Sequence, residues 1–253
     1  MTAPDYVPGH GLLAGKNVLI TAAAGTGIGF ATARRCVEEG ASVVISDKHE
    51  RRCRESAAEL GVPGIACDVT DEDSVRALIA GASEAFAASN RGGIDVLINN
   101  AGLGGTVELH EMTDDQWSLV LDVTLNGTFR CMRAGLQHMY ERGSGVIVNN
   151  ASVLGWRAQE GQAHYAAAKA GVMALTRCAA IEAGKRGVRV NAVAPSIAMH
   201  PFLAKVTSDE LLDELTQREA FGRYAEPWEV ANVMVFLASD YSSYMTGEVV
   251  SVS

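Results

Sequence analysis

The fold class of this chain is decided by residues Asn17–Gly29, which have the sequence NVLITAAAGTGIG. Asn17–Thr21 predicts a buried strand, and an amphipathic helix is expected over Phe30–Glu39, where Gly40 ends it. A turn of small residues between a strand and a helix lets the backbone approach a pyrophosphate, which the helix N-terminus attracts. The predicted phosphate contacts are Thr21, Gly25, Gly27, Ile28 and Gly29.

The second predicted strand, Ser42–Ser46, ends at an acidic residue, Asp47, which lies 20 residues beyond Gly27. A carboxylate at this distance suits the ribose hydroxyls of NAD and repels the 2′-phosphate of NADP. The basic residues Lys48, Arg51 and Arg52 could accept that phosphate, although a turn into the next helix would leave them in solvent. NAD is therefore the expected cofactor, and NADP stays possible.

Strands and helices alternate along the rest of the chain. Five more strands are expected at Gly64–Cys67, Asp95–Asn99, Gly145–Asn149, Val188–Val193 and Glu248–Val252. Helices are expected at Asp71–Ala87, Thr113–Tyr140, Ala163–Lys185 and Ser208–Ala220, the second with a helix cap at Thr113–Gln116. Such alternation predicts an α/β fold with a doubly wound, Rossmann-type, seven-stranded parallel sheet flanked by helices. Ligands of such sheets bind at the carboxyl ends of the strands.

Three residues have the spacing of an acid/base catalyst. Tyr165 and Lys169 lie four positions apart, on one face of a predicted helix, and Ser152 follows the strand 13 positions before Tyr165. The Lys169 ammonium would stand beside the Tyr165 phenol and lower its pKa from about 10 toward the working pH. Ser152 would hydrogen-bond the same substrate oxygen. A surface Tyr and Lys on an alanine-rich helix is the plainer interpretation, and the phosphate turn favours catalysis.

Composition limits the remaining functions. The chain has 253 residues, of which 48% are hydrophobic, which fits a single domain over residues 1–253 with a loose arm at Met1–Gly11. Its net charge of −9 argues against nonspecific nucleic-acid binding. No apolar run reaches membrane-spanning length and no signal peptide is apparent, so a cytoplasmic location is expected.

Neither the cysteines nor the histidines predict a metal site or a disulfide framework. Five scattered cysteines lack metal-ligand spacing, so reduced thiols are expected. The residues His110, His138 and His164 lie far apart, without a carboxylate or cysteine pattern around them. His164 adjoins Tyr165 but belongs to another helix face, which suggests a packing role.

From Leu12 to Gly247 the chain resembles the short-chain dehydrogenase/reductase family, in its subgroup of about 250 residues. The motifs that carry the resemblance are the turn at Thr21–Gly29, Asp68-Val69, Asn99-Asn100-Ala101-Gly102, the Ser152/Tyr165/Lys169 set and the segment Asn191–Pro195. Matches continue at Arg223, Pro227, Glu229, Phe236, Leu237, Ser239, Asp240 and Gly247. The resemblance implies that Asp68 and Val69 contact adenine, that Asn99, Ala101 and Gly102 support the cofactor, and that Pro195 and Ile197 line the nicotinamide.

The chain departs from the family pattern at several positions. The phosphate turn has Ala22 in place of a glycine and one extra residue before Gly27. Thr124 occupies the position where the family often has an asparagine, and Asn126, two residues on, would point elsewhere. Ser196 replaces a glycine, His200 stands where a threonine often meets the nicotinamide amide, and the C-terminus lacks the usual Asp-Gly-Gly. We therefore expect a catalytic triad and not a tetrad.

The substrate is inferred by resemblance. The segments Thr21–Gly29, Val153–Gln159 and Ala194–Ala198 are similar to a small actinobacterial group that acts on CoA thioesters from steroid C/D-ring degradation, where a ring alcohol is oxidised to a ketone. The alternatives are a fatty-acid-type 3-oxoacyl-thioester reductase, on ACP or CoA, and a non-catalytic dinucleotide sensor. Family members form homo-oligomers, so a tetramer or dimer is expected.

A lid is expected over residues 200–222, and it would supply part of the substrate site. The predicted apolar wall consists of Trp156, Met199, Phe202 and Leu203. The predicted contacts to a CoA phosphate are Arg157, Lys205 and Arg223, although surface arginines are usually only solvated.

Overall fold

The computed structural model describes residues 2–87, 92–199 and 209–253. Within these ranges, seven parallel strands form one sheet in the order β3-β2-β1-β4-β5-β6-β7, which confirms the predicted fold. The strands are β1 Asn17–Ile20, β2 Ser42–Asp47, β3 Gly64–Ala66, β4 Val96–Asn99, β5 Gly145–Asn150, β6 Val188–Pro195 and β7 Val249–Val252. The strand order reverses between β1 and β4, which is where ligands of such sheets bind.

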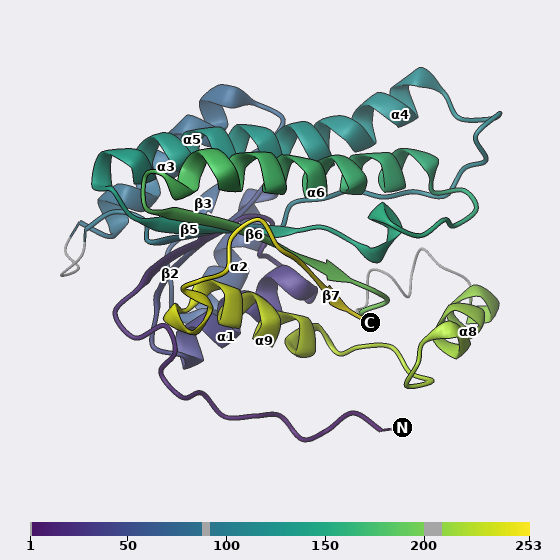
Figure 1. Cartoon of the computed structure of the whole chain (residues 1–253), viewed down its shortest axis with the longest axis horizontal. Helices are drawn as coiled ribbons and strands as arrows, with labels where there is room; N and C mark the ends of the chain where they lie inside the picture. The colour runs from purple at the N-terminus through teal and green to yellow at the C-terminus, as the bar shows by residue number, and fades with distance from the viewer. Residues whose placement is uncertain (1, 88–91, 200–208) are drawn as a thin grey trace.

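Helices cover both faces of the sheet (Figure 1). They are α1 Ile28–Glu38, α2 Glu50–Leu60, α3 Glu72–Ala85, α4 Asp114–Leu121, α5 Gly127–Arg142, α6 Ala163–Gly184, α8 Asp209–Arg218 and α9 Pro227–Ala238. In the view of Figure 1, α3 to α6 lie above the sheet and α1, α2 and α9 below it. The helices expected at 163–185 and 208–220 correspond to α6 and α8, whose observed ends differ from the expected ends by at most two residues.

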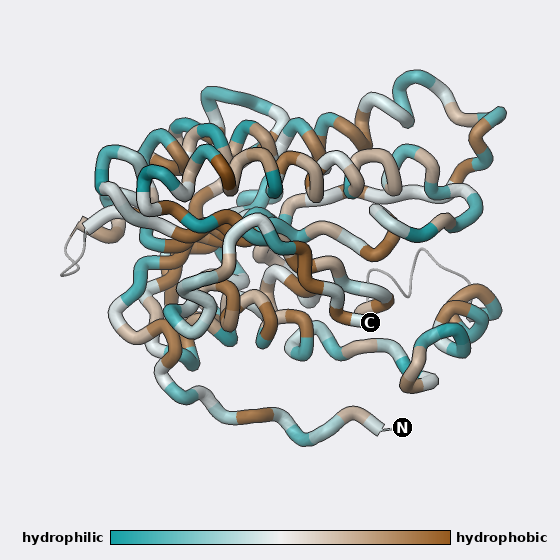
Figure 2. The backbone as a smooth tube through the Cα atoms, viewed as in Figure 1, coloured by the Kyte–Doolittle hydropathy of each residue, from teal (hydrophilic) through white to brown (hydrophobic). Residues whose placement is uncertain are grey.

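Two apolar cores lie on the two faces of the sheet because side chains alternate along each strand. In β1, Leu19 belongs to the core beneath α3, α5 and α6, whereas Val18 and Ile20 belong to the core against α1 and α9. All three side chains are fully buried. Figure 2 shows the hydrophobic strands running through the middle of the molecule.

The predicted helix Thr113–Tyr140 is not continuous. Thr113 caps α4 through the expected capping box with Gln116, but a π-helical turn, Asp122–Asn126, separates α4 from α5. Thr128 Oγ1 donates a hydrogen bond to the Thr124 carbonyl oxygen at 2.8 Å, inside the region where the helical pattern changes. Periodicity could not predict the turn, because one extra residue hardly alters the hydrophobic pattern.

The N-terminal arm has no helix or strand among residues 2–11, and its side chains and backbone contact α1 and α9. The Tyr6 ring packs edge-on against Trp228 of α9, with 5.2 Å between ring centroids. The Arg35 guanidinium of α1 donates hydrogen bonds to the carbonyl oxygens of Val7, at 2.6 Å, and Pro8. The arm is therefore held across α1 and α9.

No helix of the described residues combines the length and apolar character that a membrane crossing needs. The five cysteines are free, and four of them are buried.

Candidate active site

The turn between β1 and α1 brings the predicted phosphate contacts together. An added Cβ on Gly29 would lie 2.4 Å from Asn100 Nδ2 and 2.5 Å from the Ala22 carbonyl oxygen, so only glycine fits there. Gly25 has a φ of 96° and donates its N–H to Ser56 Oγ at 3.1 Å. Gly27 caps α1 without a side-chain hydrogen bond, and the first turn of α1 carries no acidic residue. These features suit a bound pyrophosphate.

The residues after β4 hold this turn in place. Thr21 Oγ1 accepts hydrogen bonds from the backbone N–H groups of Asn100, at 3.0 Å, and Ala101, at 3.2 Å. Asn100 Nδ2 donates to the Ala22 carbonyl oxygen at 2.9 Å. Ala22 has a φ of 49°, the left-handed conformation that glycine adopts most easily. The turn keeps its shape with alanine at the usual glycine position because these bonds fix it from the neighbouring strand.

Basic residues pair with the acidic residues at the predicted adenosine end. Asp47 is 4% exposed, and its Oδ1 accepts hydrogen bonds from the His49 N–H at 2.9 Å and Arg52 Nη2 at 2.8 Å. Lys48 forms an ion pair of 2.7 Å with Asp68. All three side chains are exposed, as expected, at 65% for Lys48, 50% for Arg52 and 83% for Arg51, but Lys48 and Arg52 also pair with acidic neighbours. Arg52 reaches back because the first turn of α2 places it over the end of β2.

The predicted catalytic residues meet at the end of β5. Ser152 is 8% exposed, accepts a hydrogen bond from the Leu154 N–H at 3.2 Å, and is hydrogen-bonded to the Tyr165 phenol. Lys169 is buried, and its Nζ donates to the Asn150 carbonyl oxygen. The same Nζ lies 5.5 Å from the centroid of the Tyr165 ring. The geometry therefore gives one hydroxyl pair at the reacting position and one ammonium behind it.

The ionisation of the pair differs from the expectation. Burial raises the pKa of Tyr165 to about 12, and the Ser152 hydrogen bond offsets only part of this rise. Burial lowers the pKa of Lys169 to about 7. The predicted lowering of the phenol pKa by Lys169 is thus wrong for the protein alone, because the ammonium bonds Asn150 and lies over the ring face. Tyr165 is consequently a proton donor at neutral pH.

A buried amide network supports the site from below. Asn99 Nδ2 donates to Asn149 Oδ1 at 2.9 Å, and Asn149 Nδ2 donates to Thr176 Oγ1 of α6 at 2.9 Å. Gly102 lies against Lys169, since an added Cβ would sit 3.4 Å from its Nζ. Strands β4 and β5 are thereby fixed to the helix that carries Tyr165.

The other predicted contacts lie around this centre. Val69 packs against Gly127, where an added Cβ would lie 2.7 Å from Val69 Cγ2. Pro195 ends β6, and the Ile197 carbonyl oxygen accepts from the Ala225 N–H at 2.9 Å, which ties this segment to residue 225. The Met199 N–H donates to the Ala225 carbonyl oxygen at 3.0 Å, and Trp156 is 53% exposed. The predicted site residues Phe202, Leu203 and Lys205 lie outside the described ranges. His200 also lies outside them.

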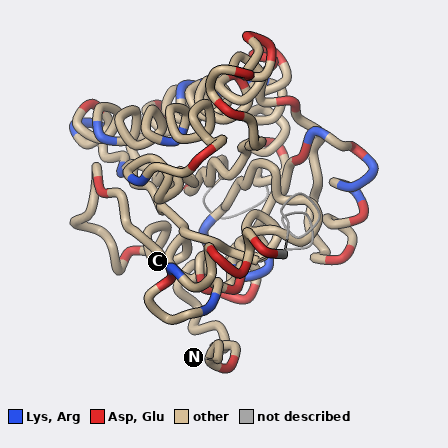
Figure 3. The backbone as a smooth tube through the Cα atoms, turned by 90° about the vertical axis from the view of Figure 1, so that its right-hand side faces the viewer, with Lys and Arg blue, Asp and Glu red and all other residues tan. Residues whose placement is uncertain are grey.

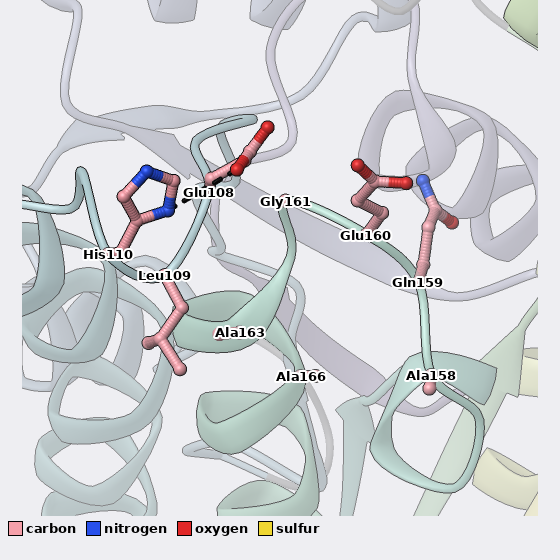
Figure 4. Close-up of a pocket in the computed structure, with 9 residues that line it drawn as sticks. All are labelled: Glu108, Leu109, His110, Ala158, Gln159, Glu160, Gly161, Ala163 and Ala166. Carbon is pink, nitrogen blue, oxygen red and sulfur yellow. Dashed lines mark ion pairs between the residues drawn. The ribbon is translucent and has the colours of Figure 1, made fainter.

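A cavity of about 610 Å³ lies between the segments 108–110 and 158–166 (Figure 4). Neither Ser152 nor Tyr165 lines it. No group of three or more potential metal-binding His, Cys, Asp or Glu side chains occurs in the described part of the chain. His164 is buried, and its Nδ1 accepts a hydrogen bond from the Tyr165 N–H at 2.9 Å, so its predicted packing role includes holding the tyrosine's backbone.

Known proteins match this chain along almost its whole length. A family model described as enoyl-(acyl carrier protein) reductase, one of those for short-chain dehydrogenases, matches residues 22–253. The (5R,7aS)-5-hydroxy-7a-methyl-1-oxo-2,3,5,6,7,7a-hexahydro-1H-indene-carboxyl-CoA reductase of Mycobacterium tuberculosis is 62% identical over 99% of this chain and 97% of its own length. The chain belongs to the short-chain dehydrogenase/reductase family.

Two further comparisons agree with this assignment. The 3-oxoacyl-(acyl carrier protein) reductase of Thermotoga maritima is 38% identical over 95% of this chain and 97% of its own length. The crystal structure of a short chain dehydrogenase from Mycobacterium smegmatis superposes with a TM-score of 0.88 at 56% identity, covering 100% of this chain and 97% of the other. Short-chain dehydrogenase/reductases bind NAD(P), and this chain is an oxidoreductase of that family that interconverts alcohols and ketones.

Thr124 has a clear structural role at the position of the family's asparagine. Its hydroxyl donates to the Leu103 carbonyl oxygen at 3.0 Å and accepts from the Leu103 N–H at 2.9 Å, and the residue is fully buried. Asn126 is exposed and donates to Asp122 Oδ1 at 3.1 Å, which confirms that it points elsewhere. Thr124 therefore fixes the segment after Gly102 against the π-helical turn.

We expect Thr124→Asn to be tolerated. An amide can donate to and accept from Leu103 through separate atoms, so both hydrogen bonds can persist. The turnover number should change by less than about tenfold, the equivalent of 1.4 kcal/mol. Thr124→Val, which keeps the shape and loses both bonds, should lower the free energy of unfolding by about 1–3 kcal/mol. If Thr124→Asn had no effect and Asn126→Ala abolished turnover in a folded protein, the alignment of this helix would be wrong.

Sequence reasoning missed several residues that complete this short-chain dehydrogenase/reductase site. Asn150 holds Lys169 through its backbone, and Asn100 holds the phosphate turn. Asn100 lies in the recognised Asn-Asn-Ala-Gly motif, which was a usable signal. The roles of Asn150 and Ser56 had no signal in the sequence, since each depends on a contact between separate elements.

Proposed function

We propose that this chain interconverts a secondary alcohol and a ketone on the ring of a bicyclic CoA thioester from steroid degradation. The observation that carries the proposal is the 62% identity, over nearly both whole chains, to a relative named for a hexahydroindene-carboxyl-CoA substrate. Ser152 and Tyr165 supply the hydroxyl pair that such a reaction needs. Trp156, which is 53% exposed, and Met199 would supply apolar surface for a fused ring.

In this mechanism the described residues handle the proton and the substrate oxygen. Tyr165 donates a proton to the ketone oxygen in reduction and accepts it from the alcohol in oxidation, while Ser152 orients the same oxygen. Lys169 holds the cofactor ribose and supports the tyrosine from behind. The turn after β1, Asp47, Asp68 and Ile197 would hold NAD(P), which would supply or accept the hydride when bound.

A linear 3-oxoacyl thioester is the alternative substrate, supported by the 38% identity to the Thermotoga maritima reductase. The lower identity favours the bicyclic substrate. A non-catalytic dinucleotide sensor would bind its ligand through the phosphate turn and Lys169, and would have no need for the Ser152 and Tyr165 hydroxyl pair.

The experiment is a turnover screen with NAD(H) and NADP(H) against bicyclic and linear acyl-CoA alcohols and ketones. The proposal expects the highest kcat/KM with the bicyclic pair. Preference for the linear 3-oxoacyl thioester would establish the alternative. Dinucleotide binding without turnover of any substrate would favour the hypothesis of a non-catalytic dinucleotide sensor.

We infer that NAD is the preferred cofactor. The Asp47 carboxylate, held at the end of β2, would lie against a ribose 2′-phosphate and repel it by up to a few kcal/mol, at an effective dielectric constant near 20. Such repulsion corresponds to an affinity difference of about ten- to a few-hundredfold. The Arg52 ion pair reduces the repulsion, which keeps NADP as a weaker ligand.

Asp47→Ser should therefore narrow the preference for NAD over NADP, mainly by raising the affinity for NADP. The reason is that Arg52 then becomes available to the 2′-phosphate. Arg52→Ala should weaken the binding of NADP and widen the preference for NAD. Arg51→Ala is the matched control, since that side chain is exposed and only 3.8 Å from Glu55, and it should change neither affinity. Dissociation constants of the four dinucleotides decide the matter, and a wild type that binds NADP(H) more tightly than NAD(H) would refute the inference.

We further propose a cytoplasmic homo-oligomer, a tetramer or dimer. The exposed apolar side chains Leu119, Phe129 and Ile181 lie on α4, α5 and α6, where a second subunit could cover them. Light scattering coupled to size-exclusion chromatography measures the assembly, and a monomer would contradict the proposal.

A further inference from the structure

Three cations are expected to meet a CoA phosphate, and the structure describes two of them, Arg157 and Arg223. Arg223 is committed to Glu229 by two hydrogen bonds of 2.7 Å, one from each terminal nitrogen. Lys205 lies outside the described residues. Arg157 is exposed, and its Nη2 has a long hydrogen bond of 3.4 Å to Ser253 Oγ. Of the two described cations, Arg157 is therefore the one without a carboxylate partner.

Arg157 differs from the other described cations at the carboxyl ends of the strands. Arg52 and Lys48 form ion pairs with Asp47 and Asp68, whereas Arg157 has no acidic partner among the residues that the structure describes. Its backbone N–H donates to the Val153 carbonyl oxygen at 2.9 Å, which fixes its position directly after the turn that follows Ser152. The backbone of Arg157 is thus held next to the turn that follows Ser152.

The other flank of the same loop is acidic. Glu108 and Glu160 line the cavity of about 610 Å³, from its two sides (Figure 4). His110 is shared between Glu108, at 3.3 Å, and Glu111, at 4.0 Å, so one neutral or singly charged imidazole faces two carboxylates. Figure 3, viewed from the right of Figure 1, shows further acidic residues at the top of the molecule, where α4 lies. This flank repels a polyanion.

We propose that Arg157 binds the phosphates of the CoA moiety, while the acidic flank at Glu108 and Glu160 keeps that moiety away from the cavity. The proposal rests on the proposed function, because it assumes a CoA thioester as substrate. In this proposal the ring of the thioester lies against Ser152 and Tyr165, and its phosphates extend past the 157–161 loop. Coulomb attraction and the bidentate geometry of guanidinium with phosphate favour the Arg157 side.

The test compares a bicyclic CoA thioester with the pantetheine thioester of the same acid, which lacks the phosphates of the nucleotide. Arg157→Ala should raise KM for the CoA thioester about three- to tenfold with kcat unchanged, which is the range of one partly solvated ion pair. KM for the pantetheine thioester should not change. Added salt should raise KM for the CoA thioester in the wild type more than in Arg157→Ala.

Two matched variants complete the experiment. Arg177→Ala removes an exposed arginine of α6 remote from the site and should leave both KM values unchanged. Glu160→Gln removes one acidic charge and should lower KM for the CoA thioester slightly. Equal effects of Arg157→Ala on both thioesters, or no effect on either, would overturn the proposal.

A direct binding measurement keeps this proposal separate from the proposed function. Free CoA is titrated into wild type and Arg157→Ala by calorimetry, with no requirement for turnover. Loss of CoA affinity in Arg157→Ala would support the phosphate site even if no bicyclic substrate were turned over. Equal affinity of the two proteins for CoA, together with turnover of the bicyclic thioester, would overturn the phosphate site alone.

Discussion

Tyr165→Phe is expected to abolish nearly all turnover and to leave dinucleotide binding intact. The change removes the proton donor hydrogen-bonded to Ser152. Dinucleotide binding should survive because the phosphate turn at residues 21–29 does not include Tyr165. General acid/base catalysis contributes about 10²- to 10⁴-fold, so kcat should fall by at least about 100-fold. Steady-state kinetics and dinucleotide titration measure the two effects.

Tyr140→Phe is the matched control, because that tyrosine packs against Arg186, away from the site, and its loss should leave kcat unchanged. Lys169→Ala should differ from Tyr165→Phe by weakening the dinucleotide as well as turnover, since one ammonium serves both. A Tyr165→Phe enzyme with near wild-type kcat would refute the catalytic assignment.

The raised pKa of Tyr165 also sets the sign of the pH dependence. With a pKa of about 12, the phenol keeps its proton through the neutral range, so ketone reduction has its donor there. Alcohol oxidation needs the phenolate, whose fraction rises about tenfold for each pH unit below the pKa. Oxidation should therefore accelerate between pH 7 and 10 while reduction does not, and a flat oxidation profile over that range would contradict this.

Arg35→Met is expected to cause the largest loss of stability. Arg35 is 4% exposed and Glu39 is fully buried, and the two form an ion pair of 2.9 Å beneath the N-terminal arm. Removing one partner of a buried pair typically costs about 3–5 kcal/mol, because the other charge stays buried without compensation. The variant also loses the hydrogen bonds to Val7 and Pro8 that hold the arm. Urea unfolding at pH 7 measures the change.

The neighbouring Arg34→Met is its matched control. Arg34 pairs with Glu59 at 2.7 Å, but both side chains are more than half exposed, so the loss should stay within about 1 kcal/mol. Adding Glu39→Gln to Arg35→Met should recover part of the stability, because no unpaired charge then remains. Equal losses for Arg34→Met and Arg35→Met would contradict the buried-pair explanation.

The same pair predicts a loss of stability in acid. Burial raises the pKa of Glu39, but the N–H groups of Leu12 and His10 and the charge of Arg35 outweigh it, and the net pKa is lowered. A carboxylate whose pKa is lowered on folding stabilises the folded state at pH values above its unfolded-state pKa. This contribution is lost as the pH falls through the folded-state pKa. Unfolding curves from pH 7 to 3 should show this loss in the wild type.

The sequence by itself determined the order of the elements, the parallel sheet and the candidate catalytic residues. These features depend on local signals: the strand, turn and helix at Asn17–Gly29, the alternation of strands and helices, and the i, i+4 spacing of Tyr165 and Lys169. Each of these signals is read from residues that are close in the sequence or from the order of the elements. Their physical effect is the same wherever the segment sits, so they could be predicted without knowing the remaining contacts.

Only the tertiary structure decided the charges and supports around these residues. Arg52 pairs with Asp47, the Lys169 ammonium bonds Asn150, Thr124 bonds Leu103, and the arm is anchored by Arg35. Most of these contacts join residues that are 19 or more positions apart, and the Tyr165 pKa depends on burial by several elements at once. Burial and partner choice arise when the sheet and helices pack, so no local pattern encodes them.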